Sequence, residues 1–265
     1  MMEYIRELLL SPRATCFGCG SVRGTDNAFL CSDCYASIVP LVASGSSISA
    51  LCANCGEEYA AGTCRVCGKR KVEIVQAAAA YEYEGAIKNL IHVFKFNGVW
   101  RMSDWMANEM LRACSDDFLS GVSVVVPVPM HALRKLSRGY NQSEKLAKAF
   151  SKKTNIPYAI LLKRVRNTKQ QARLSTTARR SNLKHAFKAV KKLSAETVLL
   201  IDDVRTTGTT AIECVKALLS AGAKEVRVLT FAKAIANQNK NRKYRPDRGG
   251  KLTRLVRADK NENRF

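Results

Sequence analysis

Two adjacent carboxylates, Asp202 and Asp203, lie between an apolar run and a threonine-rich turn. The run from Val198 to Ile201 predicts a central strand buried on both faces, so the acid pair comes at its carboxyl end. Open α/β sheets bind their ligands at that edge. Carboxylates placed there can accept hydrogen bonds from hydroxyl groups or bind Mg²⁺.

The turn after the acid pair has the composition of a phosphate-binding loop. A glycine at its centre permits a positive φ, and threonine hydroxyls add donors to the unpaired amides of a helix start. A phosphate beside a cis-diol, as in a ribose 5-phosphate, would satisfy the turn and the acid pair together. An acidic pair alone also fits a solvated strand end, but the complete pattern favours the ligand site. The turn consists of Thr206, Thr207, Gly208, Thr209 and Thr210.

Eight of the ten cysteines form four CxxC pairs near the N-terminus. A CxxC pair forms a knuckle, and two knuckles supply the tetrahedral four-sulfur site that zinc prefers, with no open position. We therefore predict two structural zinc ions in a reducing compartment, with successive knuckles paired. Pairing of the two middle knuckles and redox chemistry are the alternatives. The predicted sets are Cys16, Cys19, Cys31 and Cys34, and Cys52, Cys55, Cys64 and Cys67.

The segment that must position the acid pair alternates strand-like and helix-like patterns, which predicts an α/β fold with a mostly parallel sheet. We divide the chain into a double zinc ribbon over 1–71, an α/β domain over 72–235 and a basic, disordered tail over 236–265. The expected strands are 72–83, 122–129, 158–165, 185–190, 197–201 and 225–234, and the expected helices are 84–96, 101–114, 143–153 and 209–221.

Three segments carry a resemblance to known families. Residues Val198 to Thr210 resemble the phosphoribosyl pyrophosphate (PRPP) signature of type I phosphoribosyltransferases. Residues Val126 to Ala147 and Asn167 to Phe187 resemble the competence-associated ComF family. With the zinc-type N-terminus, the similarity spans Cys16 to about Lys233.

The resemblance implies a type I phosphoribosyltransferase fold with an N-terminal zinc ribbon that binds each metal through four cysteines. It further implies Mg²⁺-assisted loss of pyrophosphate from C1 of PRPP and attack by a nitrogen nucleophile. Asp202 and Asp203 would hold the ribose hydroxyls and stabilise the positive charge of an oxocarbenium-like state, and the turn would hold the 5′-phosphate. The sequence does not name the acceptor.

The family pattern also places residues around the diphosphate. A basic loop after the strand at 122–129 would contact the pyrophosphate, and a loop with few large apolar residues, from Arg164 to Lys184, would close over PRPP and exclude water. The alternative for the first segment is a basic helix face that begins with a glycine. The matching residues are Arg134, Arg138, Gly139, Asn141 and Gln142 for the pyrophosphate, and Gln171, Arg173 and Arg179 for the flexible loop.

Aromatic residues ahead of these segments could stack on a base, although aromatic residues at such spacings more often belong to the core. The three histidines have no triad or ligand spacing, so we expect structural roles for them. The aromatic residues are Tyr81, Tyr83, Phe94, Phe96, Trp100 and Trp105.

The formal net charge of +22 is larger than PRPP binding requires. From His131 to Lys192 there are 18 lysines and arginines against one acid, and Ala234 to Phe265 adds 10 basic and 3 acidic residues. Single-stranded DNA is therefore a candidate partner, bound without sequence preference and with strong salt dependence.

The N-terminal residues do not form a signal peptide pattern, and no apolar run approaches the ~20 residues of a membrane span, so we expect a cytoplasmic protein without membrane insertion. By resemblance it acts in DNA uptake during natural transformation, together with competence proteins. A non-catalytic PRPP or nucleotide sensor and a DNA-binding adaptor are the alternative functions. The oligomeric state does not follow from the sequence.

Overall fold

The structure is a computed structural model of the 265-residue chain. It describes residues 15–21, 29–45, 47–59, 63–64, 67–68, 74–131, 136, 138–166, 183 and 185–234. The chain divides into two units, 1–235 and 236–265, and the second unit, with the predicted tail, lies outside the described residues.

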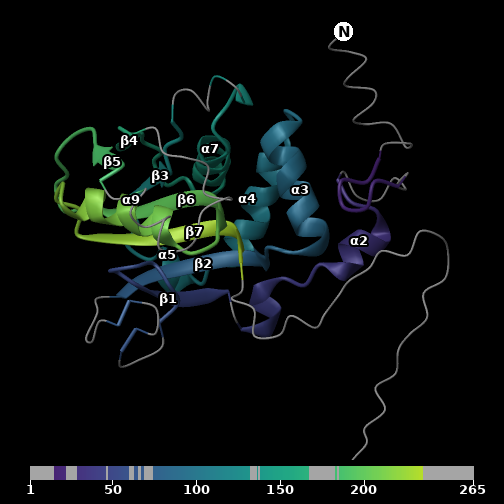
Figure 1. Ribbon diagram of the computed structural model, residues 1–265, viewed down its shortest axis with the longest axis horizontal. Helices are drawn as coiled ribbons and strands as arrows, with labels where there is room; N and C mark the ends of the chain where they lie inside the picture. Colours follow the sequence, from purple (N-terminus) through teal and green to yellow (C-terminus); the bar gives the residue numbers. More distant parts are fainter. Residues whose placement is uncertain are drawn as a thin grey trace, which may run out of the picture. The chain divides into compact units, whose positions relative to one another are not determined.

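A five-stranded sheet in the order β1-β2-β7-β6-β3 forms the centre of the first unit (Figure 1). β2, β7, β6 and β3 run parallel, and β1 is antiparallel to β2. The strands are β1 (Ile48–Cys52), β2 (Ile74–Glu82), β3 (Val124–Pro127), β6 (Thr197–Arg205) and β7 (Glu225–Lys233). This mostly parallel sheet confirms the predicted fold class.

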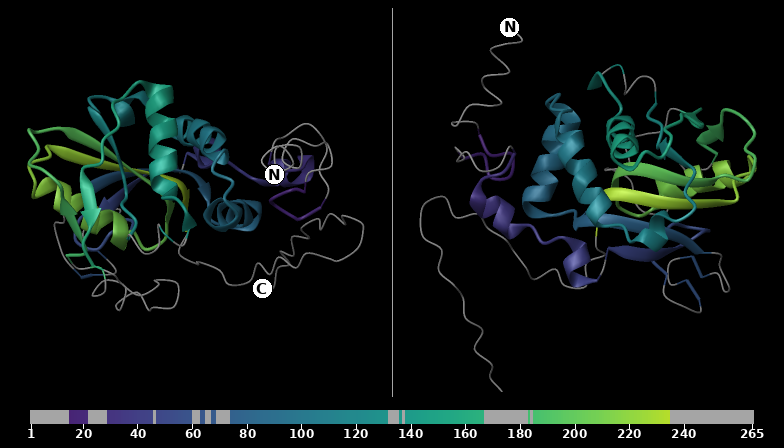
Figure 2. Two further views of the ribbon diagram at one scale, coloured as in Figure 1. Left: turned by 90° about the horizontal axis from the view of Figure 1, so that it is seen from above. Right: turned by 180° about the vertical axis from the view of Figure 1, so that it is seen from behind.

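Helices cover both faces of the sheet (Figures 1 and 2). One face packs against α3 (Gly85–Phe96), α4 (Met102–Arg112) and α7 (Gln142–Thr154). The other face packs against α9 (Thr209–Leu219) and the antiparallel pair β4 (Leu162–Arg164) and β5 (Phe187–Ala189). Shorter elements are α2 (Ser32–Ser37), the 3-10 helix η1 (Leu41–Ser44) and α5 (Asp116–Leu119).

The apolar run of β6 is buried on both faces, as predicted. Leu199 and Ile201 point into the core beneath α3, α4 and α7, whereas Val198 and Leu200 point toward α9, and all four are inaccessible to solvent. Burial of apolar surface on both sides fixes β6 as a central strand, so its carboxyl end has a fixed position.

The structure differs from the predicted elements in details that bear on the site. β6 extends through the acid pair to Arg205, because its pairing with β7 continues through the last residues of both strands. The sheet also takes β1 from the segment that sequence analysis assigned to the zinc ribbon, since Ile48–Cys52 pairs with the edge of β2. The boundary at residue 71 stays a prediction.

Candidate functional site

The acid pair at the carboxyl end of β6 is held by side chains from two helices. The Oδ2 atom of Asp203 lies 3.0 Å from the Nζ atom of Lys95, in the last turn of α3. The Ser143 hydroxyl, at the start of α7, donates to Oδ1 of Asp202 at 2.6 Å. The same oxygen accepts the backbone N–H of Asp203 at 2.9 Å. Neither carboxylate therefore points freely into solvent.

Burial and neighbouring charges shift the pKa values of Asp202 and Lys95. Burial, together with repulsion from Asp203, raises the pKa of Asp202 to about 7, although the Ser143 hydroxyl and Lys95 act in the opposite direction. Burial lowers the pKa of Lys95, but attraction to Asp203 outweighs it, so the net shift is upward. The site thus holds one cation beside two carboxylates, one of which titrates near neutral pH.

The turn after β6 has the backbone expected of a phosphate loop. Gly208 adopts a φ of 68° and is the N-cap of α9, which begins at Thr209. The hydroxyls of Thr207 and Thr209 lie 3.0 Å apart. Thr206 is exposed, Thr207 and Thr210 are half-buried, and Gly208 and Thr209 are buried. The first amides of a helix have no partner within the helix, so this end suits an anion.

Four of the residues predicted to contact pyrophosphate, Arg138, Gly139, Asn141 and Gln142, are described and lie at or just before the start of α7. Gly139 has a φ of 78°, and the guanidinium of Arg138 lies 4.7 Å from the centre of the Phe96 ring. Asn141 donates its amide to the carbonyl oxygen of Val128 at 3.0 Å, and both residues are buried.

Gln142 is buried as well and donates its amide to the carbonyl oxygen of Lys95 at 3.1 Å. These two amides therefore join the start of α7 to the residue after β3 and to α3. Arg134 and the loop residues Gln171, Arg173 and Arg179 lie outside the described residues.

The eight cysteines gather in two clusters that match the predicted sets. Within each cluster the sulfur atoms lie within 4.8 Å of one another. The distance between sulfur atoms is 3.8 Å for Cys19 and Cys31, 3.8 Å for Cys52 and Cys67, and 3.6 Å for Cys55 and Cys64.

A tetrahedral zinc ion with Zn–S bonds of ~2.3 Å requires sulfur atoms ~3.8 Å apart. In the first cluster, the backbone amides of Gly18 and Cys31 also donate to the Cys16 sulfur, at 3.3 Å and 3.2 Å, as outer-shell donors do around a metal-binding cysteine. Both clusters could therefore hold zinc ions.

Sequence reasoning missed two residues of the site, Lys95 and Ser143. Lys95 precedes the acid pair by more than 100 residues, and its one local signal is that it is a cation within the apolar stretch VFKF. Ser143 follows Asn141 and Gln142, which were singled out, and its position in the first turn of a helix after the β3 strand could have identified it.

The aromatic residues divide into core and surface. Tyr81 and Phe94 are buried, Trp105 packs partly against the same core, and Phe96 and Trp100 are 57% and 47% exposed. A cation lies over each exposed ring. The Arg138 guanidinium lies over Phe96, and the Lys145 ammonium lies 4.5 Å from the centre of the Trp100 ring. The core interpretation is therefore wrong for these two exposed rings.

None of the described helices combines the length and the hydropathy that crossing a bilayer requires.

Comparisons with known proteins agree with this architecture. The phosphoribosyl transferase domain model matches residues 123–255. Competence protein F of Haemophilus influenzae is 34% identical over 193 residues, covering 69% of this chain and 84% of that protein. Competence protein ComFC of Bacillus subtilis is 28% identical over 234 residues, covering 84% and 85%. DNA utilization protein YhgH of Escherichia coli K12 is 28% identical over 192 residues, covering 70% and 85%. The chain belongs to the ComF family and carries a phosphoribosyl transferase domain.

Proposed function

We propose that the chain binds PRPP together with Mg²⁺ and transfers its ribosyl phosphate to a nitrogen nucleophile. The observation that carries this proposal is the position of Asp202 and Asp203, held by Lys95 and Ser143 directly before the Gly208 turn and the start of α9. Carboxylate acceptors next to an anion site suit a pentose with a terminal phosphate.

The chain's own residues would act by binding and electrostatics. The start of α9 binds the 5′-phosphate through its amides and the threonine hydroxyls, and Asp202 and Asp203 accept the ribose hydroxyls. Their negative charge stabilises the oxocarbenium-like state as the bond from C1 to pyrophosphate breaks. The acceptor nitrogen then bonds to C1, and its proton passes to water.

Carboxylate oxygens suit Mg²⁺, but Asp203 already pairs with Lys95, so we assign the ion chiefly to the oxygens of PRPP. When bound, Mg²⁺ neutralises the diphosphate charge.

Binding is tested by titrating Mg²⁺-PRPP into the wild type and into the double variant Asp202→Ala/Asp203→Ala. The exposed neighbouring acids Asp116 and Asp117 provide a matched control, Asp116→Ala/Asp117→Ala. We expect binding by the wild type and the control and a loss of at least tenfold in the site variant. Absence of binding to the wild type would overturn the proposal.

Release of pyrophosphate in the presence of nitrogenous acceptors distinguishes a transferase from a sensor. A transferase releases one pyrophosphate for each acceptor modified, whereas a sensor binds PRPP without turnover. A screen of acceptors by PRPP consumption also identifies the substrate that the sequence does not name.

We also infer a role in DNA uptake, supported by the relatives named competence and DNA utilization proteins. The rings of Phe96 and Trp100, exposed beside Arg138 and Lys145, favour single-stranded DNA as the ligand, because bases stack on aromatic faces while cations bind phosphates. Competence proteins are the partners that this role implies.

DNA binding is tested with a single-stranded oligonucleotide across a salt series. We expect the logarithm of the association constant to fall with the logarithm of the salt concentration, with a slope of about −0.7 for each phosphate neutralised. The double variant Phe96→Ala/Trp100→Ala should weaken binding, whereas Tyr35→Ala, at an exposed aromatic residue on α2, should not. A slope near zero would exclude the phosphate contacts.

A further inference from the structure

The second cysteine cluster lies directly against the phosphate loop. The contact is between Gly56, which follows the Cys52 to Cys55 knuckle, and Gly208 at the start of α9. A Cβ atom on Gly56 would lie 2.5 Å from both the carbonyl carbon and the carbonyl oxygen of Gly208 and 2.9 Å from Ile212. A Cβ atom on Gly208 would in turn collide with the Gly56 carbonyl oxygen. The two backbones therefore touch without room for a side chain on either.

Ion pairs fasten the same knuckle to the strand before the loop. Glu58 accepts from Arg205 at 2.9 Å and from Lys233 at 3.1 Å, at the ends of β6 and β7. The side chains of Arg205 and Lys233 are only 3% and 6% exposed. One carboxylate of the knuckle segment thus compensates two buried cations, and one of them directly precedes Thr206.

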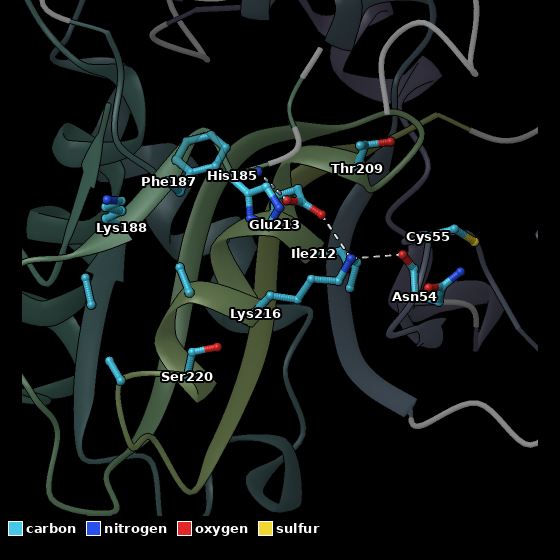
Figure 3. A pocket seen from close by; sticks show the side chains of 13 residues that line it. Asn54, Cys55, His185, Phe187, Lys188, Thr209, Ile212, Glu213, Lys216 and Ser220 are labelled. Atoms are coloured by element: carbon cyan, nitrogen blue, oxygen red, sulfur yellow. Dashed lines mark hydrogen bonds and ion pairs between the residues drawn. The ribbon is translucent and has the colours of Figure 1, made fainter. Parts of the chain in front are cut away.

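A further contact fastens the knuckle to the helix after the loop. The Lys216 ammonium, on α9, donates to the carbonyl oxygen of Asn54 at 3.1 Å and to Glu213 at 2.9 Å (Figure 3). Asn54 and Cys55 together with Thr209 help to line one pocket of about 790 Å³, which extends along α9 to Phe187 and Lys188 of β5 (Figure 3). The knuckle is therefore attached on both sides of the turn.

Backbone hydrogen bonds within the cysteine knuckle hold Gly56 in place. The Gly56 amide donates to the carbonyl oxygen of Cys52 at 2.7 Å, and the Cys52 amide donates to that of Glu57 at 2.9 Å. A metal ion bound to the four sulfurs would close this knuckle around a fixed centre and prevent Gly56 from moving away from Gly208.

We propose that the second four-cysteine site is part of the phosphate site, with Gly56, Asn54 and Glu58 as positioning residues that hold the loop from Thr206 to Thr210 in its anion-binding conformation. This inference rests on the proposed binding of PRPP. The first cluster contacts a different element, α3, where the Asn89 side-chain amide donates to the Gly18 carbonyl oxygen at 2.7 Å.

Matched glycine variants test the inference. Gly20, Gly56 and Gly68 each follow a knuckle cysteine with a positive φ, of 81°, 83° and 69°, but a Cβ atom on Gly20 or Gly68 meets nothing within 4 Å. Alanine at each position thus adds the same kind of backbone strain, and Gly56→Ala alone adds the collision with the phosphate loop. Gly68→Ala tests the same cluster, and Gly20→Ala tests the other one.

PRPP affinity is measured by calorimetry on zinc-loaded protein, with the zinc content of each variant determined in parallel. We expect Gly56→Ala to keep two zinc ions and to bind PRPP about tenfold more weakly or worse. Gly68→Ala and Gly20→Ala should stay within about twofold of the wild type. Equal PRPP affinity in Gly56→Ala and Gly68→Ala would overturn the inference.

Hydrogen exchange separates failure of this inference from failure of the proposed function. The amides from Thr206 to Thr210 should exchange faster in Gly56→Ala than in Gly68→Ala without any ligand, since the measurement reports loop opening alone. If the wild type does not bind PRPP but this difference appears, the proposed function fails and the positioning role stands. If exchange is the same in both variants, the positioning role fails.

Thermodynamic linkage between zinc binding and PRPP binding gives a second test, which a merely structural role of Gly56 would not affect. If zinc in the second site favours PRPP binding, PRPP must raise zinc affinity at that site by the same factor. In competition with a chelator, PRPP should therefore increase retention of one zinc ion in the wild type and not in Gly56→Ala. Equal protection by PRPP in both proteins contradicts the coupling.

Discussion

The ion pair between Lys95 and Asp203 should be strongly coupled, and a double-mutant cycle measures the coupling. The two charges lie 3.0 Å apart, and their side chains are 22% and 10% exposed. At an effective dielectric constant of about 20, unit charges at this distance attract by about 5 kcal/mol, from which the cost of removing both from water must be subtracted. A net coupling of about 2 kcal/mol is therefore expected.

The single variants should not be equivalent. Lys95→Met leaves the Asp203 carboxylate buried beside Asp202, and removing one partner of a buried pair costs about 3 kcal/mol. Asp203→Asn leaves Lys95 facing the Asp202 charge, so we expect a smaller loss of about 1 kcal/mol. The double variant should be about 2 kcal/mol more stable than the sum of the single losses predicts.

Urea denaturation at constant zinc concentration, monitored for the four proteins of the cycle, gives these free energies of unfolding. The slope of the unfolding free energy against urea must be the same for all four, since a different slope means that the denatured or native state has changed or that the transition is not two-state. If the two losses add to within about 0.5 kcal/mol, the ion pair is not coupled and our account of how the acid pair is held is wrong.

Three further outcomes follow from the structure. Burial raises the pKa of Asp202 to about 7. At pH values below 7, PRPP affinity should therefore decrease by up to about tenfold for each pH unit. In Asp202→Asn, the pH dependence of PRPP affinity should come only from titration of the PRPP phosphates. Glu58→Gln should lower the free energy of unfolding by about 1–3 kcal/mol in urea denaturation, since the buried Arg205 and Lys233 lose the negative charge of Glu58. Elemental analysis should find two zinc ions per chain, and fewer would contradict the grouping of the cysteines.

Local patterns predicted the parts of the site that are continuous in sequence. The apolar residues of β6, the acid pair and the turn at Gly208 follow one another, so the strand, its carboxyl end and the helix start could be inferred together. The two cysteine sets were predictable for the same reason, because the knuckle spacing is a property of short segments.

The partners of these groups were not predictable, because they come from distant segments. Lys95 and Glu58 reach the ends of β6 and β7 only through packing between elements, and no periodicity in a single segment contains that contact. Phe96 lies next to Lys95 at the end of α3, where the apolar pattern predicts core, yet the helix turns this ring outward. Whether an apolar residue at the end of a helix is buried or exposed depends on the elements that pack against the helix.

The place of β7 in the sheet bears on how the chain folds as it is made. β7 is the last of the described strands, but it lies between β2 and β6, and its pairing with β2 joins segments about 150 residues apart, such as Ala77 and Val228. Until residues 225–233 leave the ribosome, β1–β2 and β6–β3 are separate ribbons, each with an unpaired edge that can aggregate. Closure of this long chain loop is slow, so nascent chains should depend on chaperones up to that moment.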